Sequence, residues 1–188
     1  MINKDDYLIE LKNVNITETD ISNLLNMVNE LSEYWIQYEP NVKPAGFDPL
    51  WKEAKYYDEK FDWGCWLKYP NILDHPQVKE IISRLPSDLV IKSCSVMKSP
   101  PWFHLTPHID PRDASFLVVL TPNASPVYFL DDQSNLILEH TYTCPTVINT
   151  HIIHGSNNLS DFDRITFQLG IVQPWEEIVH ILKSSGIA

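Results

Sequence analysis

Residues 89–120 read LVIKSCSVMKSPPWFHLTPHIDPRDASFLVVL, and they set the pattern for the C-terminal half of the chain. Short runs rich in β-branched and aromatic residues alternate with prolines, as expected of strands joined by turns. Similar runs continue to residue 172 with no helical segment between them. The expected strands are 89–97, 102–109, 115–120, 127–130, 136–142, 146–153 and 165–172. This series favours an antiparallel sandwich or barrel over a parallel sheet, and a double-stranded β-helix, or jelly roll, is the natural choice.

The first 88 residues have a helical and aromatic character. Apolar side chains recur at helical spacing over 17–38, with Thr17 or Thr19 as the N-cap. Prolines and aromatic residues over 39–73 indicate ordered loops around one short helix at 50–57. A further helix is expected over 74–85, where a proline follows and stops it.

These patterns predict a single domain over 1–188 that is mainly β with N-terminal α-helices. A helical and aromatic portion, 1–88, would pack on a cupin-like double-stranded β-helix core, 89–175, which a C-terminal tail, 176–188, would follow. A hydrophobic content of 44% is ample for such a core.

Composition also bears on partners and compartment. The net charge is -11 and the basic residues form no run, so nucleic acid is not an expected partner. The three cysteines are widely separated and form no Cys-x-x-Cys pair, which argues against a disulfide framework and a zinc knuckle. A charged N-terminus and the lack of a stretch of about 18 apolar residues predict neither secretion nor membrane insertion. The expected compartment is the cytoplasm.

Two histidines and one aspartate have the spacing of a metal site. His108 and Asp110 are separated by one residue, and in an extended strand such side chains point to the same face. His154 lies 44 residues after Asp110. Two imidazoles and one carboxylate on one side of an ion leave the opposite positions open, as in non-heme iron sites. The alternatives are a surface turn at 107–113 and His151 as the third ligand in place of His154.

Arg164 follows ten residues after His154 and opens an expected strand. A guanidinium there can hold a carboxylate through two parallel hydrogen bonds. Thr166 lies two residues further on the same strand face and can add a hydroxyl to the same carboxylate. The alternative is a structural ion pair between Arg164 and Asp161 or Asp163.

Other residues are candidates for contact with a substrate or with the ligands. Arg112 can hold an acidic group of the substrate, although a solvent-exposed arginine is the alternative. The Trp and Tyr residues over 51–69 either line a substrate groove or fill the core. His104 is either a hydrogen-bonding partner near the metal ligands or a structural histidine.

Over roughly residues 90–175, this order of H-x-D, distal His and Arg resembles the Fe(II)- and 2-oxoglutarate-dependent oxygenase superfamily. The run His154-Gly155-Ser156-Asn157-Asn158 and the turn Leu120-Thr121-Pro122-Asn123 are similar to the aspartyl/asparaginyl β-hydroxylase-like branch. The chain departs from that branch in two places. Asp110 supplies a metal carboxylate that several members lack, and the basic residue on their next strand is replaced near Ser115-Phe116.

The resemblance implies Fe(II) as the cofactor and 2-oxoglutarate as the co-substrate, with the far carboxylate of 2-oxoglutarate on Arg164 and Thr166. It implies an O2-dependent dioxygenase that hydroxylates an amino acid, a peptide side chain or another small polar metabolite. Halogenating relatives carry a small residue at the position of Asp110, so a carboxylate there favours hydroxylation. Two other classes stay open: a cupin-like metalloenzyme that works without 2-oxoglutarate, and a non-enzymatic jelly-roll binding module.

Overall fold

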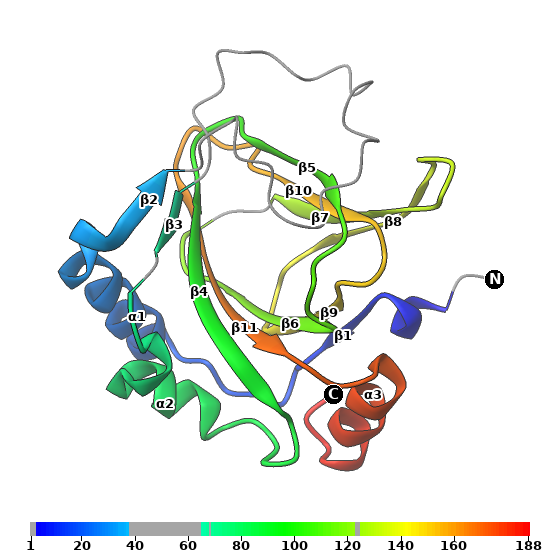
Figure 1. The fold of residues 1–188 in the computed structure, drawn as a ribbon, viewed down its shortest axis with the longest axis horizontal. Coiled ribbons are helices and arrows are strands. Elements are labelled where there is room, and N and C mark those ends of the chain that lie inside the picture. Colours follow the sequence, from blue (N-terminus) through cyan, green and yellow to red (C-terminus); the bar gives the residue numbers. More distant parts are fainter. Residues whose placement is uncertain (1–2, 38–64, 68, 123–124) are drawn as a thin grey trace.

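In the computed structural model, which describes residues 3–37, 65–67, 69–122 and 125–188, two antiparallel β-sheets face each other (Figure 1). Gln37, Cys65, His104 and Thr106 are described by their backbone alone. The larger sheet has the order β1-β9-β6-β11-β4-β3-β2 and the smaller one β5-β10-β7-β8. The strands are β1 Leu8–Glu10, β2 Trp35–Gln37, β3 Cys65–Leu67, β4 Ile91–Ser99, β5 His104–His108, β6 Ala114–Val119, β7 Pro126–Leu130, β8 Leu136–Thr141, β9 Thr146–Asn149, β10 His154–Asn157 and β11 Arg164–Ile171. This is the double-stranded β-helix that the sequence predicts.

Strand β11 is buried on both faces. Thr166 and Gln168 point into the space between the sheets, whereas Phe167 and Leu169 belong to the core outside the larger sheet. Because successive side chains of a strand alternate between faces, β11 presents polar groups inward and apolar groups outward. It pairs with β4 on one side and β6 on the other, so its backbone is held from both sides. The inward polar groups therefore stand on a rigid support.

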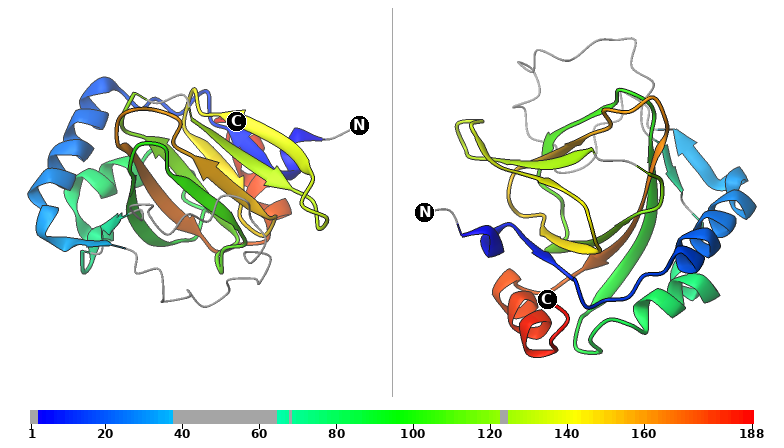
Figure 2. Two further views of the ribbon diagram at one scale, coloured as in Figure 1. Left: turned by 90° about the horizontal axis from the view of Figure 1, so that it is seen from above. Right: turned by 180° about the vertical axis from the view of Figure 1, so that it is seen from behind.

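Three α-helices of the described chain pack outside the larger sheet (Figure 2), namely α1 Glu18–Glu30, α2 Pro76–Ile82 and α3 Trp175–Ser184. Short 3-10 helices precede β1, follow α1 and precede α2, at Lys4–Asp6, Ser32–Tyr34 and Ile72–Asp74. Buried side chains from all three α-helices share one hydrophobic cluster with outward residues of the larger sheet. No helix in the described ranges is both long and apolar enough to cross a membrane.

A smaller hydrophobic cluster lies in the interior of the barrel. It contains the buried side chains Leu8, Leu117, Val127, Phe129 and Ile148. They come from strands of both sheets, and three of them also line the central pocket. The interior beside that pocket is therefore apolar, and a charged group placed there needs a partner of opposite charge.

The N-terminal portion contributes strands as well as helices, which corrects the expected division at residue 88. Strand β1 pairs with β9 at one edge of the larger sheet, while β3 and β2 extend the other edge beyond β4. The helix expected over 17–38 ends at Glu30, and the chain then forms β2. The expected helix at 50–57 and most of the expected loops over 39–73 lie outside the described residues.

The C-terminal segment expected as a tail, 176–188, is mostly helical. Helix α3 spans most of it, and Ile178 and Leu182 on its inner face are fully buried in the outer core. These side chains are four residues apart, which places them on the same face of a helix. The segment is thus part of the domain core.

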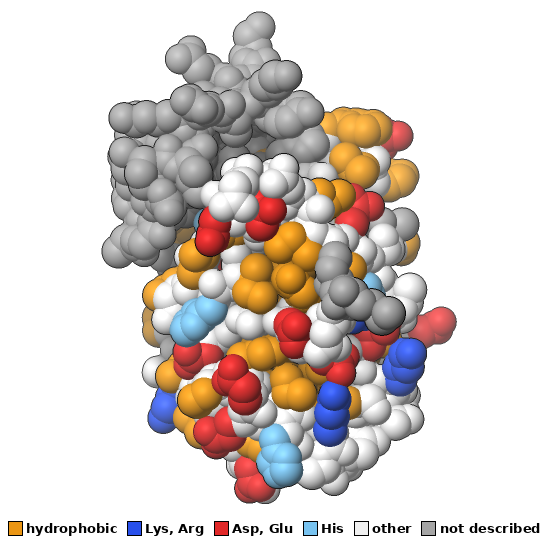
Figure 3. Space-filling view, turned by 90° about the vertical axis from the view of Figure 1, so that its right-hand side faces the viewer, with side chains coloured by type: hydrophobic (Ala, Val, Ile, Leu, Met, Phe, Trp, Pro, Cys, Tyr) orange, Lys and Arg blue, Asp and Glu red, His pale blue; other side chains and the backbone are white. Residues whose placement is uncertain are grey.

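The side of the molecule near the N-terminus and α3 shows no basic patch among its described residues (Figure 3). Lys and Arg side chains stand singly on this face, among acidic and apolar ones. This distribution matches the net charge of -11.

A largely buried carboxylate ties the start of α1 to the residues that follow α2. Asp20 accepts two hydrogen bonds from the guanidinium of Arg84, at 2.6 and 2.7 Å. It also closes a capping box with Thr17, the N-cap of α1. Hydrogen bonds from Arg84 and Thr17 outweigh the opposing effect of burial and hold the pKa of Asp20 well below its usual range.

We expect Asp20→Asn to lower the free energy of unfolding by about 1–3 kcal/mol at neutral pH. Because the pKa of Asp20 is lower in the folded state, its contribution is complete above the unfolded value of about 3.9 and is lost as the pH falls below it. The stability difference between parent and variant should therefore shrink as the solution is acidified below that value. Urea denaturation at a series of pH values measures this.

Glu80→Gln is the matched control for that experiment. Glu80 contacts the same guanidinium at 3.0 Å, but its side chain is 61% exposed. We expect it to change stability by less than about 0.5 kcal/mol. Equal losses for the two variants at every pH would contradict the role given to Asp20.

Candidate metal centre

His108 and His154 face each other across neighbouring strands of the smaller sheet. Strand β5 ends at His108, β10 begins at His154, and the register pairs these two residues directly. Their ring centroids are 4.6 Å apart. Asp110 follows β5, and one ligand atom from each of the three side chains lies within 4.8 Å of the other two. The fold thus brings together the two imidazoles and the carboxylate of the predicted site.

Asp110 reaches the histidines from the segment after the strand. Strand periodicity over 102–109 was the expected reason for its proximity to His108, but β5 ends at His108, so this reason is wrong. Thr150, which is fully buried, holds the segment instead. Its carbonyl accepts from the backbone N–H of Asp110 at 3.1 Å, and its hydroxyl donates to the carbonyl of Arg112 at 2.6 Å. A tertiary contact therefore sets the position of the carboxylate.

His154 is buried in a defined protonation state. Its Nδ1 lies 2.8 Å from the carbonyl oxygen of Ile152, which can only accept, so Nδ1 carries the proton and Nε2 keeps its lone pair. Burial and the nearby His108 lower the pKa of His154 to about 4, so the ring is neutral near pH 7. A neutral imidazole with a free lone pair is the form that binds a divalent metal.

Gly155 allows the flanking strands to close around β10. A Cβ at this position would lie 2.7 Å from the carbonyl oxygen of Leu105 and closer still to the side chain of Tyr128. The Tyr128 hydroxyl donates to that same carbonyl at 3.1 Å. A glycine directly after His154 therefore keeps β10 close to β5 and β7.

Asp110 is held in its charged form. Nε and Nη2 of Arg112 lie 2.9 and 2.8 Å from Oδ2 of Asp110, while Oδ1 lies 3.5 Å from Nε2 of His108. Burial alone would raise the pKa of Asp110, but the hydrogen bond with His108 and the charge of Arg112 outweigh it and hold the pKa well below its usual range. A charged carboxylate beside His108 and the neutral ring of His154 is a donor set that suits a divalent cation.

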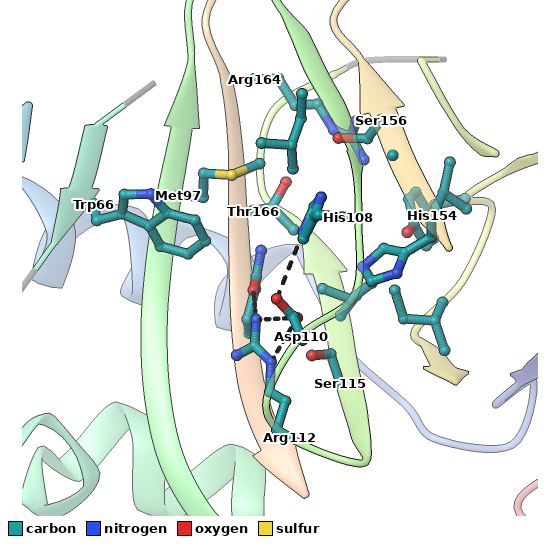
Figure 4. A pocket seen from close by; sticks show the side chains of 17 residues that line it. Trp66, Met97, His108, Asp110, Arg112, Ser115, His154, Ser156, Arg164 and Thr166 are labelled. Carbon is teal, nitrogen blue, oxygen red and sulfur yellow. Dashed lines mark hydrogen bonds and ion pairs between the residues drawn. The ribbon is translucent and has the colours of Figure 1, made fainter. Parts of the chain in front are cut away.

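The three side chains line a pocket inside the barrel (Figure 4). The pocket holds about 440 Å³ of empty space, part of it open to solvent. Arg164 and Arg112 lie at opposite ends of it, with Trp66 and Met97 along one side. The pocket therefore joins a candidate metal centre to both charged and apolar walls.

Arg164 lies in this pocket without an acidic partner among the described residues. It is 2% exposed, and its Nη1 donates to the carbonyl of Asn157 at 3.1 Å. Its Nε and the hydroxyl of Thr166 are buried and have no hydrogen-bond partner in the described part of the chain. A buried donor left unpaired costs about 1–3 kcal/mol. An anionic ligand at this place would pair both groups.

Tyr142 forms part of the wall beside Arg164. The guanidinium carbon lies 5.4 Å from the centroid of its ring, a distance at which the ring attracts a cation. Burial raises the pKa of Tyr142 to about 12, so the phenol is neutral near pH 7 and does not serve as the counter-ion. No described residue therefore serves as an acidic counter-ion for Arg164.

The structure separates several alternatives that the sequence left open. His151 has a side chain that is 58% exposed and lies 3.2 Å from Asp113, away from the cluster that contains His154. Arg164 forms no ion pair with Asp161 or Asp163, all three of which are described. The side chain of Arg112 is 19% exposed and is bound to Asp110. The alternative of a solvent-exposed arginine is therefore wrong.

The aromatic residues over 51–69 divide between the two expected roles. Trp66 lines the pocket, whereas Tyr69 packs edge-on against Tyr34 with ring centroids 4.9 Å apart. Those before residue 65, and the side chain of His104, lie outside the described part of the structure.

Several polar residues of the site were missed by sequence reasoning. Ser115 and Gln168 line the pocket, and the Ser115 hydroxyl is buried without a hydrogen-bond partner among described residues. Gln168 alternates with apolar residues inside an expected strand, so period-two alternation was the signal that could have found it. Ser115 opens a run of apolar residues and carries no such signal. Thr150 carries no such signal, because its role depends on the contact with the Asp110 segment.

No protein-family model matches the chain, and no curated protein matches it. Solved structures do share its fold. The non-heme alpha ketoglutarate dependent epimerase SnoN from nogalamycin biosynthesis is 10% identical with a TM-score of 0.57, covering 88% of this chain and 76% of that one. A Pseudomonas putida prolyl-4-hydroxylase is 11% identical with a TM-score of 0.52, covering 88% and 92%.

A prolyl hydroxylase from Trichoplax adhaerens, in complex with a hypoxia inducible factor peptide fragment, is 14% identical with a TM-score of 0.53, covering 88% of this chain and 83% of that one. At such identities the likeness shows the fold alone, and it confirms the double-stranded β-helix. The resemblance to the aspartyl/asparaginyl β-hydroxylase-like branch stays a prediction.

Proposed function

We propose that this protein is a Fe(II)- and 2-oxoglutarate-dependent dioxygenase that hydroxylates an amino acid, a peptide side chain or a small polar metabolite. The observation that carries the proposal is the shared pocket of two separate sets of groups. One is the cluster of His108, Asp110 and His154, and the other is the Arg164 Nε with the Thr166 hydroxyl, which have no hydrogen-bond partner among the described residues. The first set suits a cation and the second an anion.

The metal set fits Fe(II) by the chemistry of its donors. His108, Asp110 and His154 offer two nitrogens and one oxygen, the ligand type of non-heme iron oxygenases. His154 is held neutral and Asp110 charged, so neither must lose a proton before a cation binds. Bound iron would supply the oxidation of substrate by O2, coupled to conversion of 2-oxoglutarate into succinate and CO2.

The anion set fits the far carboxylate of 2-oxoglutarate. Arg164 and Thr166 stand on the inner face of β11, in the same pocket as the metal ligands. A carboxylate beside them would accept from the guanidinium and from the hydroxyl, and would pair buried donors that no described residue pairs. Burial of both residues excludes water from this end of the pocket and strengthens the attraction.

The remaining walls bear on the substrate that is oxidised. Trp66 and Met97 give the pocket that holds His108 and Asp110 an apolar side (Figure 4). An apolar wall positions an aliphatic or aromatic portion of a ligand by exclusion of water. The related structures include an epimerase and hydroxylases of prolyl residues, and this range supports a small molecule or a peptide side chain.

An anaerobic titration tests the proposal. Fe(II) and then 2-oxoglutarate are added to the parent protein, and the visible charge-transfer band of an iron-bound 2-oxo acid is followed. We expect a band that requires both additions and that decays when O2 is admitted, with release of succinate. Metal binding without a band on addition of 2-oxoglutarate would favour a cupin-like metalloenzyme. A folded protein that binds no metal would favour a binding module.

A further inference from the structure

The two oxygens of Asp110 have different surroundings. Oδ2 lies 2.9 Å from Nε and 2.8 Å from Nη2 of Arg112, whereas Oδ1 lies 3.5 Å from Nε2 of His108. Arg112 therefore binds Oδ2 of Asp110, the oxygen that does not face His108. Only Oδ1 faces His108, as Figure 4 shows with the dashed contacts on either side of this carboxylate.

The fold builds a fixed place for Arg112. Its Nη2 donates to Oε1 of Gln168 on β11 at 3.2 Å, and its carbonyl accepts from the hydroxyl of Thr150 at 2.6 Å. Its side-chain stem lies on Gly170, where an added Cβ would come within 3.2 Å of Cδ of Arg112. Gln168 and Gly170 are two residues apart on the inner face of β11. The segment after β5, Gly170 and the side-chain amide of Gln168 thus orient the guanidinium of Arg112.

We propose that Arg112 is a positioning residue for the metal centre, which fixes Asp110 as a one-oxygen ligand and balances its charge. The inference rests on the proposed function, because it concerns the same cluster of ligands. It differs from the role expected from the sequence, in which Arg112 anchors an acidic group of the substrate. Nε of Arg112 already donates to Asp110 and Nη2 to Gln168, so few N–H groups of the guanidinium are left to bind a second carboxylate.

Loss of Arg112 would act on the metal through Asp110. A buried carboxylate without its cationic partner is free to rotate and to present both oxygens, and groups that orient a ligand typically contribute 10–100-fold to metal affinity. Lysine at this position would keep the charge but not the contact of two nitrogens with Oδ2, since an ammonium is a point donor. The two substitutions therefore separate charge balance from orientation.

The test uses Co(II) as the probe, because its visible spectrum reports the number and arrangement of its ligands. Parent, Arg112→Met, Arg112→Lys and Arg84→Met are titrated with Co(II) under conditions in which circular dichroism shows each to be folded. Arg84→Met is the matched control, since Arg84, which follows α2, binds the carboxylate of Asp20 on α1, and neither residue lines the pocket. We expect Arg112→Met to bind Co(II) about 10–100-fold more weakly than the parent. Its spectrum should also change, Arg112→Lys should recover part of the affinity, and Arg84→Met should match the parent.

The possible results distinguish failure of the positioning role of Arg112 from failure of the proposed metal centre. Equal affinities and identical spectra for parent, Arg112→Met and Arg112→Lys would overturn the positioning role alone. If the affinities and spectra were equal but Arg112→Met raised the KM for the oxidised substrate, Arg112 would be a substrate anchor instead. A parent protein that binds no Co(II) would overturn the metal centre itself and this inference with it. Should Arg112→Met fail to fold, Arg112→Lys carries the test, because a spectrum and an affinity equal to the parent's would also overturn the role.

Discussion

His154→Ala is expected to weaken Fe(II) binding by at least about 100-fold and to abolish any 2-oxoglutarate-dependent oxidation. Loss of a direct ligand should cost more than the 10–100-fold typical of groups that merely orient one. The two remaining side chains, His108 and Asp110, cannot complete the three-donor set that the fold assembles. Anaerobic Fe(II) titration of the parent and the variant measures the effect.

His151→Ala is the control for this substitution. His151 lies three residues before His154 and competes with it in the sequence, but its side chain is 58% exposed and contacts Asp113. We expect its removal to leave Fe(II) affinity within about twofold, because exposed ion pairs contribute little. Loss of metal on His151→Ala together with retention on His154→Ala would reverse the assignment of the third ligand.

The strands of the barrel were readable from the sequence where they are long and alternate. Strand β11 has eight residues with a clear two-residue period, and it was expected within one residue of its bounds. Strands β1 and β3 have three residues each, too few for a period to show, and they form by pairing with β9 and β4. Helix α3 did carry a signal, since Ile178 and Leu182 are four residues apart after a proline, and it was overlooked.

In the candidate site, too, the residues within a regular strand were predictable and those between strands were not. The same-face prediction for Arg164 and Thr166 is met, because both lie within one regular strand and line one pocket. The proximity of Asp110 to His108 has another origin, the contacts of Thr150 with the segment after β5. Those contacts join residues separated by about forty positions, and no local pattern encodes them. Local periodicity therefore predicts where the side chains of strand residues point. Tertiary contacts determine the positions of residues between strands.

Arg164→Met is expected to raise the concentration of 2-oxoglutarate needed for half of the charge-transfer band by about 100-fold. Methionine retains much of the buried volume, but it removes a charged donor pair whose hydrogen bonds contribute about 1.5–3 kcal/mol each. Fe(II) affinity should stay near that of the parent, because Arg164 is outside the cluster of ligand atoms. Thr166→Val, which removes one hydroxyl at constant shape, should raise the requirement by about tenfold.

A second 2-oxo acid separates ligand recognition from a structural role for Arg164. 2-Oxopentanoate carries the same metal-binding end as 2-oxoglutarate but a methyl group where the far carboxylate would lie. If Arg164 pairs with that carboxylate, the parent should prefer 2-oxoglutarate strongly, and Arg164→Met should bind the two acids almost equally. The preference is lost because the methyl group makes no hydrogen bond that the substitution could remove, and a buried carboxylate without a cation is unfavourable. An equal loss of affinity for both acids would instead show that Arg164 supports the pocket without recognising the co-substrate.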